Sequence, residues 1–591
     1  MKKFLVYTLA TVAGIFLASI IFFIIFIGSL GAMMSSNKKE VNIKDNSVLV
    51  INTSTEIVDL PSDNIFSSFD LMSMNTVKSV GLNEVLKNIQ KAANDPKIKG
   101  IYIDAGSTPS GFASLYEVRD ALEKFKKESG KFVVAYSNEG MTQMSYFFAS
   151  VADEVYLNPA AQMSLQGMAS QTPYYKKALD KLGVDVQVFR HGKFKGAVEP
   201  YMLDKMSEEN KEQISVYLNS IWKSILGKIS SSRNISVDQL VYFSDNLSAD
   251  YPEDALKNGL IDGILYADEF QDLLKEKLGV SSSKKINEVK MSKYSNVPAS
   301  KDKSKKISRD KISIIYAEGE IVDENSYSDI YGTKYAELIR KERKDSTVKA
   351  IVFRVNSPGG SAMMSDLIWR EIKLTTEVKP VVVSMGNYAA SGGYYISAPA
   401  TKIFAEPVTI TGSIGVFGMM PQAKELIENK LLLNFETVST NKHSDMGSIV
   451  RPVTEEEKEY MQKGIEKVYS EFVNKVADGR RMTFEGVDEI AQGRVWSGSD
   501  AIKIGLVDEL GGLTDAINEA ARLANIENYR TKELPEEDSY SSFFKQLTEE
   551  AKVRMLKKEL GEYYNVFKSV QNIKNIDGVQ ARMPYTIEMG Y

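Results

Sequence analysis

Short apolar runs of about four to six residues alternate with helical patterns along most of the chain. They lie at residues 47–52, 100–104 and 132–136 in the first half, and at 311–316, 350–355 and 380–385 in the second. Runs of this kind are typical of strands buried on both faces, and the helical patterns between them suit the crossovers of parallel sheets. The pattern therefore predicts an α/β fold.

The same segment pattern occurs twice. Three matched pairs show this: Asp95 with Asp345 at an offset of 250, Pro159 with Pro407 at 248, and Asp254 with Asp500 at 246. An offset that drifts so little indicates a tandem duplication of one domain of about 220 to 250 residues. Differences between the two copies are then the places to look for function.

The duplication divides the chain into five segments. We expect a membrane anchor at 1–45, a first repeat at 46–280, an exposed Ser- and Lys-rich linker at 281–310, a second repeat at 311–530, and a C-terminal helix and tail at 531–591. The helix in the last segment is suggested by apolar positions from Phe544 to Met555.

The N-terminal segment has the composition of a transmembrane helix. Residues 4–34 carry no charged side chain, which exceeds the roughly 20 residues needed to cross a bilayer. A cleaved signal peptide is the alternative, but its apolar region is usually about 7 to 15 residues long. Lys2 and Lys3 precede the segment, so the N-terminus is expected in the cytoplasm and the body outside, although Lys38 and Lys39 weaken that assignment.

Composition excludes several kinds of site. The net charge of −5 argues against a general preference for nucleic acid. The chain has no cysteine, so disulfides, thiolate metal sites and a cysteine nucleophile are excluded. With His191 and His443 as the only histidines, a metal site built mainly on histidine is excluded too, and we expect no cofactor. Any Ser-His-Asp triad would need one of these two.

Ser391 is the candidate nucleophile. It lies between a predicted strand and a predicted helix, where a tight turn exposes a hydroxyl and the helix N-terminus lends positive dipole. A plain N-cap serine fits the same place. In the Pro159/Pro407 register the first copy has Gln143 at this position and lacks the Gly392-Gly393 pair, which favours a function specific to the second copy.

Gly359 and Gly360 follow the strand at 350–355 and precede a helix. Glycines there let the backbone approach a ligand and point N–H groups at a developing oxyanion. The equivalent segment of the first copy, residues 108–111, has lost the pair. Simple turn chemistry explains such glycines equally well when they are considered alone.

A nucleophilic serine needs a base, and Lys195 in the first copy is the candidate. In the same register the second copy has His443 or Ser444, so each copy lacks what the other holds. A lysine acts as a base only when neutral, which requires burial against apolar neighbours. Lys193 and His191 remain alternative bases nearby.

These motifs resemble those of the signal peptide peptidase A family, in its long, duplicated form, among the Clp-protease/crotonase-like serine peptidases. Residues 388–394 resemble the family's nucleophile motif, and residues 192–200 resemble its catalytic-lysine motif. The resemblance covers essentially the whole chain, including the anchor and the segment at 496–508.

The resemblance implies a role for each residue. Ser391 would attack the scissile carbonyl, and Lys195 would take its proton, protonate the leaving amine and later activate water. Gly359 or Gly360 together with Gly392 would hold the oxyanion. Ser413 would orient the lysine, although it also fits as a plain turn residue.

The chain is thus expected to be a serine endopeptidase of the inner membrane, single-pass, with a periplasmic body that cuts apolar peptides such as cleaved signal peptides. The resemblance implies a homo-oligomer, a tetramer in the long form. Alternatives are a crotonase-type acyl-CoA enzyme, which the anchor disfavours, and an inactive membrane-anchored scaffold. Whether Ser391 and Lys195 meet within one chain or between neighbours does not follow from the residues.

Overall fold

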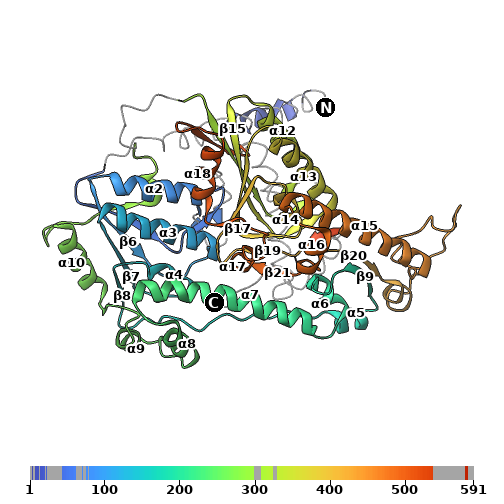
Figure 1. Ribbon diagram of the computed structural model, residues 1–591, viewed down its shortest axis with the longest axis horizontal. Helices are drawn as coiled ribbons and strands as arrows, with labels where there is room; N and C mark the ends of the chain where they lie inside the picture. Colours follow the sequence, from blue (N-terminus) through green and yellow to red (C-terminus); the bar gives the residue numbers. More distant parts are fainter. Residues whose placement is uncertain are drawn as a thin grey trace.

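Two α/β units joined by a shared sheet make up the protein (Figure 1). The computed structural model describes residues 43–61, 79–298, 308–323, 329–536 and 579–583, with scattered residues among the first 22 and residues 69–70 and 75–76. Each unit contains one mainly parallel sheet, so the predicted α/β fold is confirmed.

The first sheet is entirely parallel, in the order β10-β8-β7-β6-β1-β11. Its strands are β1 (Ser47–Asn52), β6 (Ile98–Asp104), β7 (Phe132–Ser137), β8 (Glu154–Leu157), β10 (Gly263–Ile264) and β11 (Asn287–Lys290). Helices α2 (Leu82–Asn94), α3 (Phe112–Ser129) and α4 (Gln143–Ala149) contribute to the main apolar core, and α10 (Ala267–Leu278) packs on Tyr102 and Tyr136. Parallel strands need such crossovers, which leave both faces covered.

The second sheet has the order β21-β19-β17-β15-β12-β23, and its strands β22-β18-β17-β15-β12-β23 repeat the parallel arrangement of the first sheet, whereas β21 is antiparallel to β19. Its strands are β12 (Lys311–Glu318), β15 (Val348–Ser357), β17 (Val381–Ala390), β19 (Ile410–Gly412), β21 (Val495–Ser497) and β23 (Arg530–Leu534), with β18 (Lys402–Ala405) beside β17 and β22 (Glu509–Leu510) beside β18. Its helices include α12 (Gly332–Lys344), α13 (Ala362–Thr376), α14 (Gly392–Ser397) and α18 (Leu513–Leu523).

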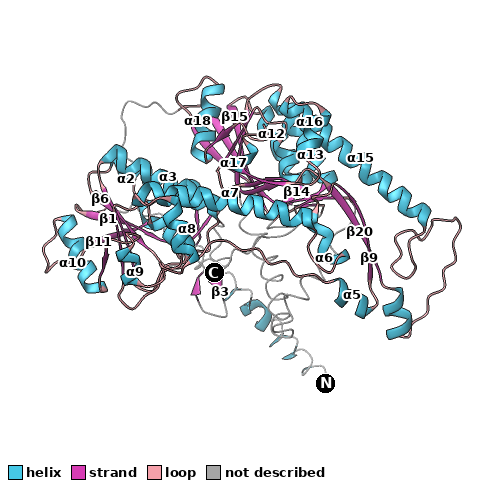
Figure 2. Ribbon diagram, turned by 60° about the horizontal axis from the view of Figure 1, so that its bottom comes forward, coloured by secondary structure: helices cyan, strands magenta, loops and turns pink. Residues whose placement is uncertain are grey.

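A third sheet draws strands from both repeats and from the C-terminal segment. Its order is β14 (Ile330–Tyr331), β13 (Ile321–Val322), β16 (Gly359–Ser361), β24 (Gln580–Arg582), β20 (Val416–Gln422) and β9 (Asp185–His191). β9 belongs to the first repeat and pairs antiparallel with β20 from Val416–His191 to Gln422–Asp185. This pairing carries part of the first repeat into the second (Figure 2).

Helix α7 (Glu208–Arg233) reinforces that connection. It follows β9, α6 (Glu199–Met202) and the cap Ser207, and runs back past both units (Figures 1 and 2). Ser220 Oγ on this helix lies 2.7 Å from Ser497 Oγ of the second repeat. The remaining α-helices and strands are α5 (Lys176–Leu182), α8 (Val237–Asp245), α9 (Pro252–Lys257), α11 (Met291–Tyr294), α15 (Glu455–Arg480), α16 (Phe484–Ile490), α17 (Gly498–Ala501), β2 (Glu56–Val58), β3 (Phe69–Asp70), β4 (Asn75–Thr76) and β5 (Ser79–Gly81).

A buried ion cluster also joins the two units. Arg354 in β15 donates from Nε to Asp59 Oδ1 at 2.8 Å, and its Nη1 lies 2.7 Å from Glu117 Oε1. Both carboxylates belong to the first repeat, and all three side chains are at most 2% exposed. Buried charges are tolerated only when paired in this way.

Two boundaries need correction. Residues 287–294, predicted to be part of an exposed linker, form β11 and α11; β11 pairs with β1, and Tyr294 lies in the first core. Residues 531–534, predicted to lie beyond the second repeat, extend β23 along β12. Both segments supply edge strands whose few apolar side chains are too short a pattern to recognise.

Among the residues that the structure describes, no helix is both long and apolar enough to cross a membrane. The uncharged segment at 4–34 lies largely outside those residues, and the helix predicted around Phe544–Met555 lies wholly outside them.

Replacing Arg354 with Met should destabilise the protein by about 3–5 kcal/mol, because Asp59 and Glu117 would be left buried without their cation. Urea unfolding monitored by circular dichroism measures this loss. Arg522→Met removes an exposed guanidinium that pairs with Glu519 and should change stability little. Equal effects of the two substitutions would contradict a stabilising role for the buried cluster.

Candidate active site

Ser391 lies at a strained turn between β17 and α14. Its backbone angles are φ 55° and ψ −113°, a conformation that residues other than glycine rarely adopt. Its amide donates to Gly412 O at 2.8 Å, while its side chain makes no capping bond. Ser391 thus occupies the N-cap position of α14, but its buried hydroxyl does not cap the helix and contacts Lys195 instead.

The first copy shows what an ordinary version of this turn looks like. There Thr142 caps α4 by accepting from Ser145 N, and Gln143 follows it. The Gln143 side-chain oxygen accepts from Gln166 N and Gly167 N at 2.9 and 2.8 Å. Gly167 precedes Gly415 by 248 residues, and Gly415 O lies 3.4 Å from Ser391 Oγ. The glutamine amide thus binds the segment of the first copy that corresponds to the one facing Ser391 in the second copy.

Lys195 reaches the second repeat through the loop after β9. Phe194 N donates to Gln492 O at 2.9 Å, and a methyl group placed on Gly493 would lie 2.7 Å from Lys195 Cβ. Gln213 on α7 bridges the lysine loop and the second repeat, because its Nε2 donates to Phe194 O and its Oε1 accepts from Val495 N. The loop is therefore fixed by strand pairing, by close backbone packing and by one bridging amide.

The Lys195 amine lies within hydrogen-bonding distance of Ser391 in the same chain. Its Nζ is 2.8 Å from Ser391 Oγ and 3.1 Å from both the carbonyl oxygen and Oγ of Ser413. The side chain is fully buried, and this burial lowers the pKa of Lys195 well below its ordinary value. A neutral amine has two N–H donors for Ser413 and one lone pair for the Ser391 hydroxyl proton.

Of the three predicted oxyanion glycines, Gly359 and Gly392 lie next to each other and Gly360 packs elsewhere. Gly359, at φ 101°, lies against Gly392, and a methyl group placed on it would be 2.7 Å from Gly392 N. Gly360 instead packs against β13, where its added methyl would lie 2.0 Å from Ile321 O. The structure thus brings Gly359 and Gly392 together beside Ser391 and places Gly360 one residue further along the strand.

The corresponding loop of the first copy is filled by the second. Asn387 of β17 inserts its side chain beside Gly111, where an added methyl would lie 2.3 Å from Asn387 Oδ1. Ala113 N donates to the same oxygen at 3.0 Å. The position that Gly359 occupies beside Gly392 in the second copy is therefore an interface contact, at Gly111, in the first copy.

The alternative bases lie elsewhere. His191 Nδ1 is 2.5 Å from Glu466 Oε2, and its ring stacks on Tyr469 at 3.7 Å. Lys193 is exposed, with its amine over the Phe194 ring. Within the described part of the chain neither contacts Ser391.

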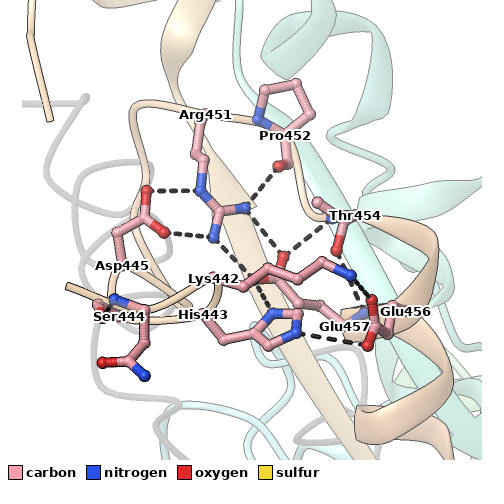
Figure 3. Close-up of polar contacts among 10 residues, drawn as sticks. Lys442, His443, Ser444, Asp445, Arg451, Pro452, Thr454, Glu456 and Glu457 are labelled. Atoms are coloured by element: carbon pink, nitrogen blue, oxygen red, sulfur yellow. Dashed lines mark hydrogen bonds and ion pairs between the residues drawn. The ribbon is translucent and has the colours of Figure 1, made fainter. Parts of the chain in front are cut away.

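The loop that matches the lysine segment in the second copy is a polar surface network (Figure 3). His443 lies near Glu456 and Glu457, and Ser444 Oγ accepts from Asn441 N at 3.1 Å. Arg451 forms paired contacts with Asp445 and Glu457 that hold this loop to the start of α15. No contact to Ser391 is found in the described part of this loop.

Residues that support the lysine loop were not recognised from the sequence. Besides Gln213, the buried Glu199 carboxylate accepts from Ser207 and from Asn210, whose side chain packs on Gly196. These residues lie on α6 and α7 at ordinary helical spacing, so no local pattern distinguishes them.

Comparison with known proteins gives the same two-fold pattern. A family model described as Peptidase family S49 matches residues 125–281 and again 373–527. Protease 4 of Haemophilus influenzae is 33% identical over 516 residues, which are 85% of this chain and 83% of that protein. Serine protease SPPA, chloroplastic, of Arabidopsis thaliana is 37% identical, covering 82% and 70% of the two chains. Protease 4 of Salmonella typhi is also 37% identical, covering 81% and 79%.

Replacing Lys195 with Met should change how stability depends on pH. Burial lowers the pKa of Lys195 in the folded state, so between that pKa and the ordinary one the unfolded chain binds more protons and wild-type stability rises with pH. Methionine does not titrate, so the stability of the variant relative to wild type should be greatest at low pH and should fall as pH approaches 10.

Urea unfolding at several pH values between 6 and 10 checks this expectation. Lys193→Met, on the exposed neighbour, should leave the wild-type dependence unchanged. A difference between Lys195→Met and wild type that is constant with pH would contradict a buried, neutral lysine.

Proposed function

The chain belongs to peptidase family S49 as a long, duplicated serine protease of the Protease 4 type, and we propose that Ser391 and Lys195 are its catalytic dyad. The observation that carries this proposal is the 2.8 Å contact between Lys195 Nζ and Ser391 Oγ in a fully buried site. Among the described residues no carboxylate forms an ion pair with Lys195, and burial lowers its pKa. A buried lysine of this kind suits proton transfer better than a structural ion pair.

In this mechanism neutral Lys195 accepts the Ser391 proton as Oγ attacks the substrate carbonyl. The ammonium form then protonates the leaving amine, which breaks the peptide bond and leaves an acyl ester on Ser391. Neutral Lys195 next takes a proton from water, and the resulting attack releases the carboxylate. Ser413 orients the amine throughout, because its carbonyl and hydroxyl oxygens both lie 3.1 Å from Nζ.

In this proposal the N–H groups of Gly359 and Gly392 stabilise the oxyanion, for which Gly359 N would leave its present acceptor, Ser357 Oγ at 3.2 Å. Gly392 is the first residue of α14, where backbone N–H groups have no partner within the helix. Removing one such donor typically costs about 3–4 kcal/mol of transition-state stabilisation. The strained turn at Ser391 is consistent with a backbone held for catalysis.

We further propose that residues 4–34 anchor the protein in the inner membrane and that its body is periplasmic. The uncharged length of this segment and the preceding Lys2 and Lys3 support this placement. Apolar peptides, such as cleaved signal peptides, are then the proposed substrates.

A homo-oligomer is supported by two coil segments whose counterparts in the other repeat pair with each other as strands. β9 pairs with β20, and the register of the repeats maps β9 to residues 433–439 and β20 to residues 168–174. Both of these segments are coil in the described structure, and the first exposes Leu433, Phe435 and Val438. We propose that residues 433–439 of one copy pair with residues 168–174 of the next, which forms a closed ring.

Labelling with a fluorophosphonate probe tests the dyad. Ser391→Ala should abolish labelling, and Lys195→Ala should reduce peptide hydrolysis by roughly 10³-fold or more, because the serine loses its base. His191→Ala should retain labelling, since that ring contacts Glu466 and Tyr469. Labelling that survives Lys195→Ala but fails in His191→Ala would assign the base to the histidine, and an unreactive wild type would favour a scaffold.

The double substitution Leu433→Asp with Phe435→Asp tests the ring. Charges on this exposed segment should leave each chain folded but dissociate the assembly to monomers, measured by light scattering after size exclusion. Val378→Asp, at an exposed apolar residue outside the segment, should keep the wild-type mass. An unchanged mass for the double variant would exclude this pairing.

A further inference from the structure

Arg494 contacts both sides of the proposed lysine site. Its carbonyl oxygen accepts a hydrogen bond from Ser413 N at 2.7 Å, and its guanidinium lies over the ring of Phe194. Ser413 belongs to the second repeat, whereas Phe194 belongs to the first and precedes Lys195. One residue therefore connects the serine that contacts the lysine amine with the loop that carries the lysine.

The backbone bond supports Ser413 in an unusual conformation. Its φ of 51° lies in the left-handed region, which residues other than glycine keep only where the surrounding structure holds them. Arg494 provides part of this support through its carbonyl oxygen, and its own amide donates to Ala491 O at 2.8 Å. The position of Arg494 thus helps to set the position of the two Ser413 oxygens that lie 3.1 Å from Lys195 Nζ.

The guanidinium covers the aromatic ring next to the lysine. Its central carbon lies 4.8 Å from the centre of the Phe194 ring and 4.7 Å from that of the Trp496 ring, distances at which a cation attracts an aromatic face. The Arg494 side chain is 20% exposed, whereas Phe194 is 6% exposed and Lys195 is fully buried. Arg494 therefore lies on the solvent side of the ring that precedes the lysine.

Stacking on the two rings, rather than an ion pair, accounts for the place of this guanidinium. Arg494 Nη2 lies 3.1 Å from Glu212 Oε1 on α7, but the Glu212 side chain is 56% exposed, and exposed pairs of this kind contribute little. Arg494 Nε is buried without a hydrogen-bond partner. A flat guanidinium can lie against two rings at once, whereas the ammonium of a lysine is a compact point charge.

Other charged side chains of the loop contact its backbone or lie toward its surface. Arg190 Nη1 is 3.4 Å from Lys195 O and 3.8 Å from Glu199 Oε1. His191 is held by a carboxylate of α15, and Lys193 is exposed. The lowered pKa of Lys195 is caused by burial rather than by a neighbouring charge. Water that reached the amine would therefore raise this pKa toward its ordinary value.

We propose that Arg494 is a positioning residue for Lys195, which holds the lysine loop against Ser413 and keeps water from the amine. This inference rests on the proposed Ser391–Lys195 dyad. Arg494 acts through Phe194 and Ser413, and it takes no part in the proton transfer itself. Without its guanidinium, Phe194 would lose its cover, and a larger share of the molecules would hold a protonated lysine at neutral pH.

The pH dependence of fluorophosphonate labelling tests this role. The labelling rate should rise as Lys195 loses its proton, so the pH of half-maximal rate reports the state of the lysine in the free enzyme. Arg494→Met should move this midpoint upward by about one pH unit or more, because water reaches the amine. Peptide hydrolysis at neutral pH should lose roughly tenfold in kcat with KM unchanged, since the share of neutral lysine falls by that factor.

Arg494→Lys separates stacking from charge and keeps a long cationic side chain, which favours a folded variant. It should shift the midpoint as Arg494→Met does, because an ammonium does not cover both rings. A wild-type midpoint in Arg494→Lys would show that charge alone suffices and would overturn the proposal.

Arg480→Met is the matched control. The Arg480 side chain is 7% exposed and pairs with Asp508 in the same repeat, so its loss should leave the midpoint unchanged. An equal shift in this control would overturn the proposal, because general loosening of the repeat would explain the effect. A wild type that labels, with the same midpoint in both Arg494 variants, would overturn the positioning role and leave the dyad in place. A wild type that does not label would overturn the dyad itself.

Discussion

The contact on which the rest of the structure depends is that between a buried lysine amine and a serine hydroxyl from the other repeat. Burial lowers the pKa of Lys195, and this burial requires both repeats to surround the amine. The pairing of β9 with β20, the bridging Gln213 and the ion cluster around Arg354 all hold the two repeats in the arrangement that this burial requires. None of these interactions is available to one repeat alone.

Each copy holds one half of the proposed dyad. In the first copy, Gln143 binds the backbone that would face a nucleophile, and Asn387 of the second copy fills the loop beside Gly111. In the second copy, the loop that matches the lysine segment forms a polar network around Arg451 (Figure 3). The counterparts of the Ser391 and Lys195 segments are thus packing and interface contacts between the repeats or within their surface.

The sequence predicts the local parts of this picture well. Buried strands, the repeat offset and the motifs around Ser391, Lys195 and Gly359 are all patterns within a few residues, and the structure brings these three residues together. Interactions between distant segments were not predictable. Gln213 has no distinguishing neighbours, and β24 has only three residues and owes its place to β16 and β20. The edge strands β11 and β23 were missed for the same reason.

The shared sheet also sets an order of events during synthesis. His191 and Val416 are partners in the ladder but lie 225 residues apart, and the lysine segment emerges first. At about 5–20 residues per second the ribosome needs roughly ten to fifty seconds to supply the missing strand. Over that interval β9 has no partner and Lys195 has no serine to activate. Under the proposed dyad, the nascent chain would therefore have no complete site until β20 (Val416–Gln422) has been made.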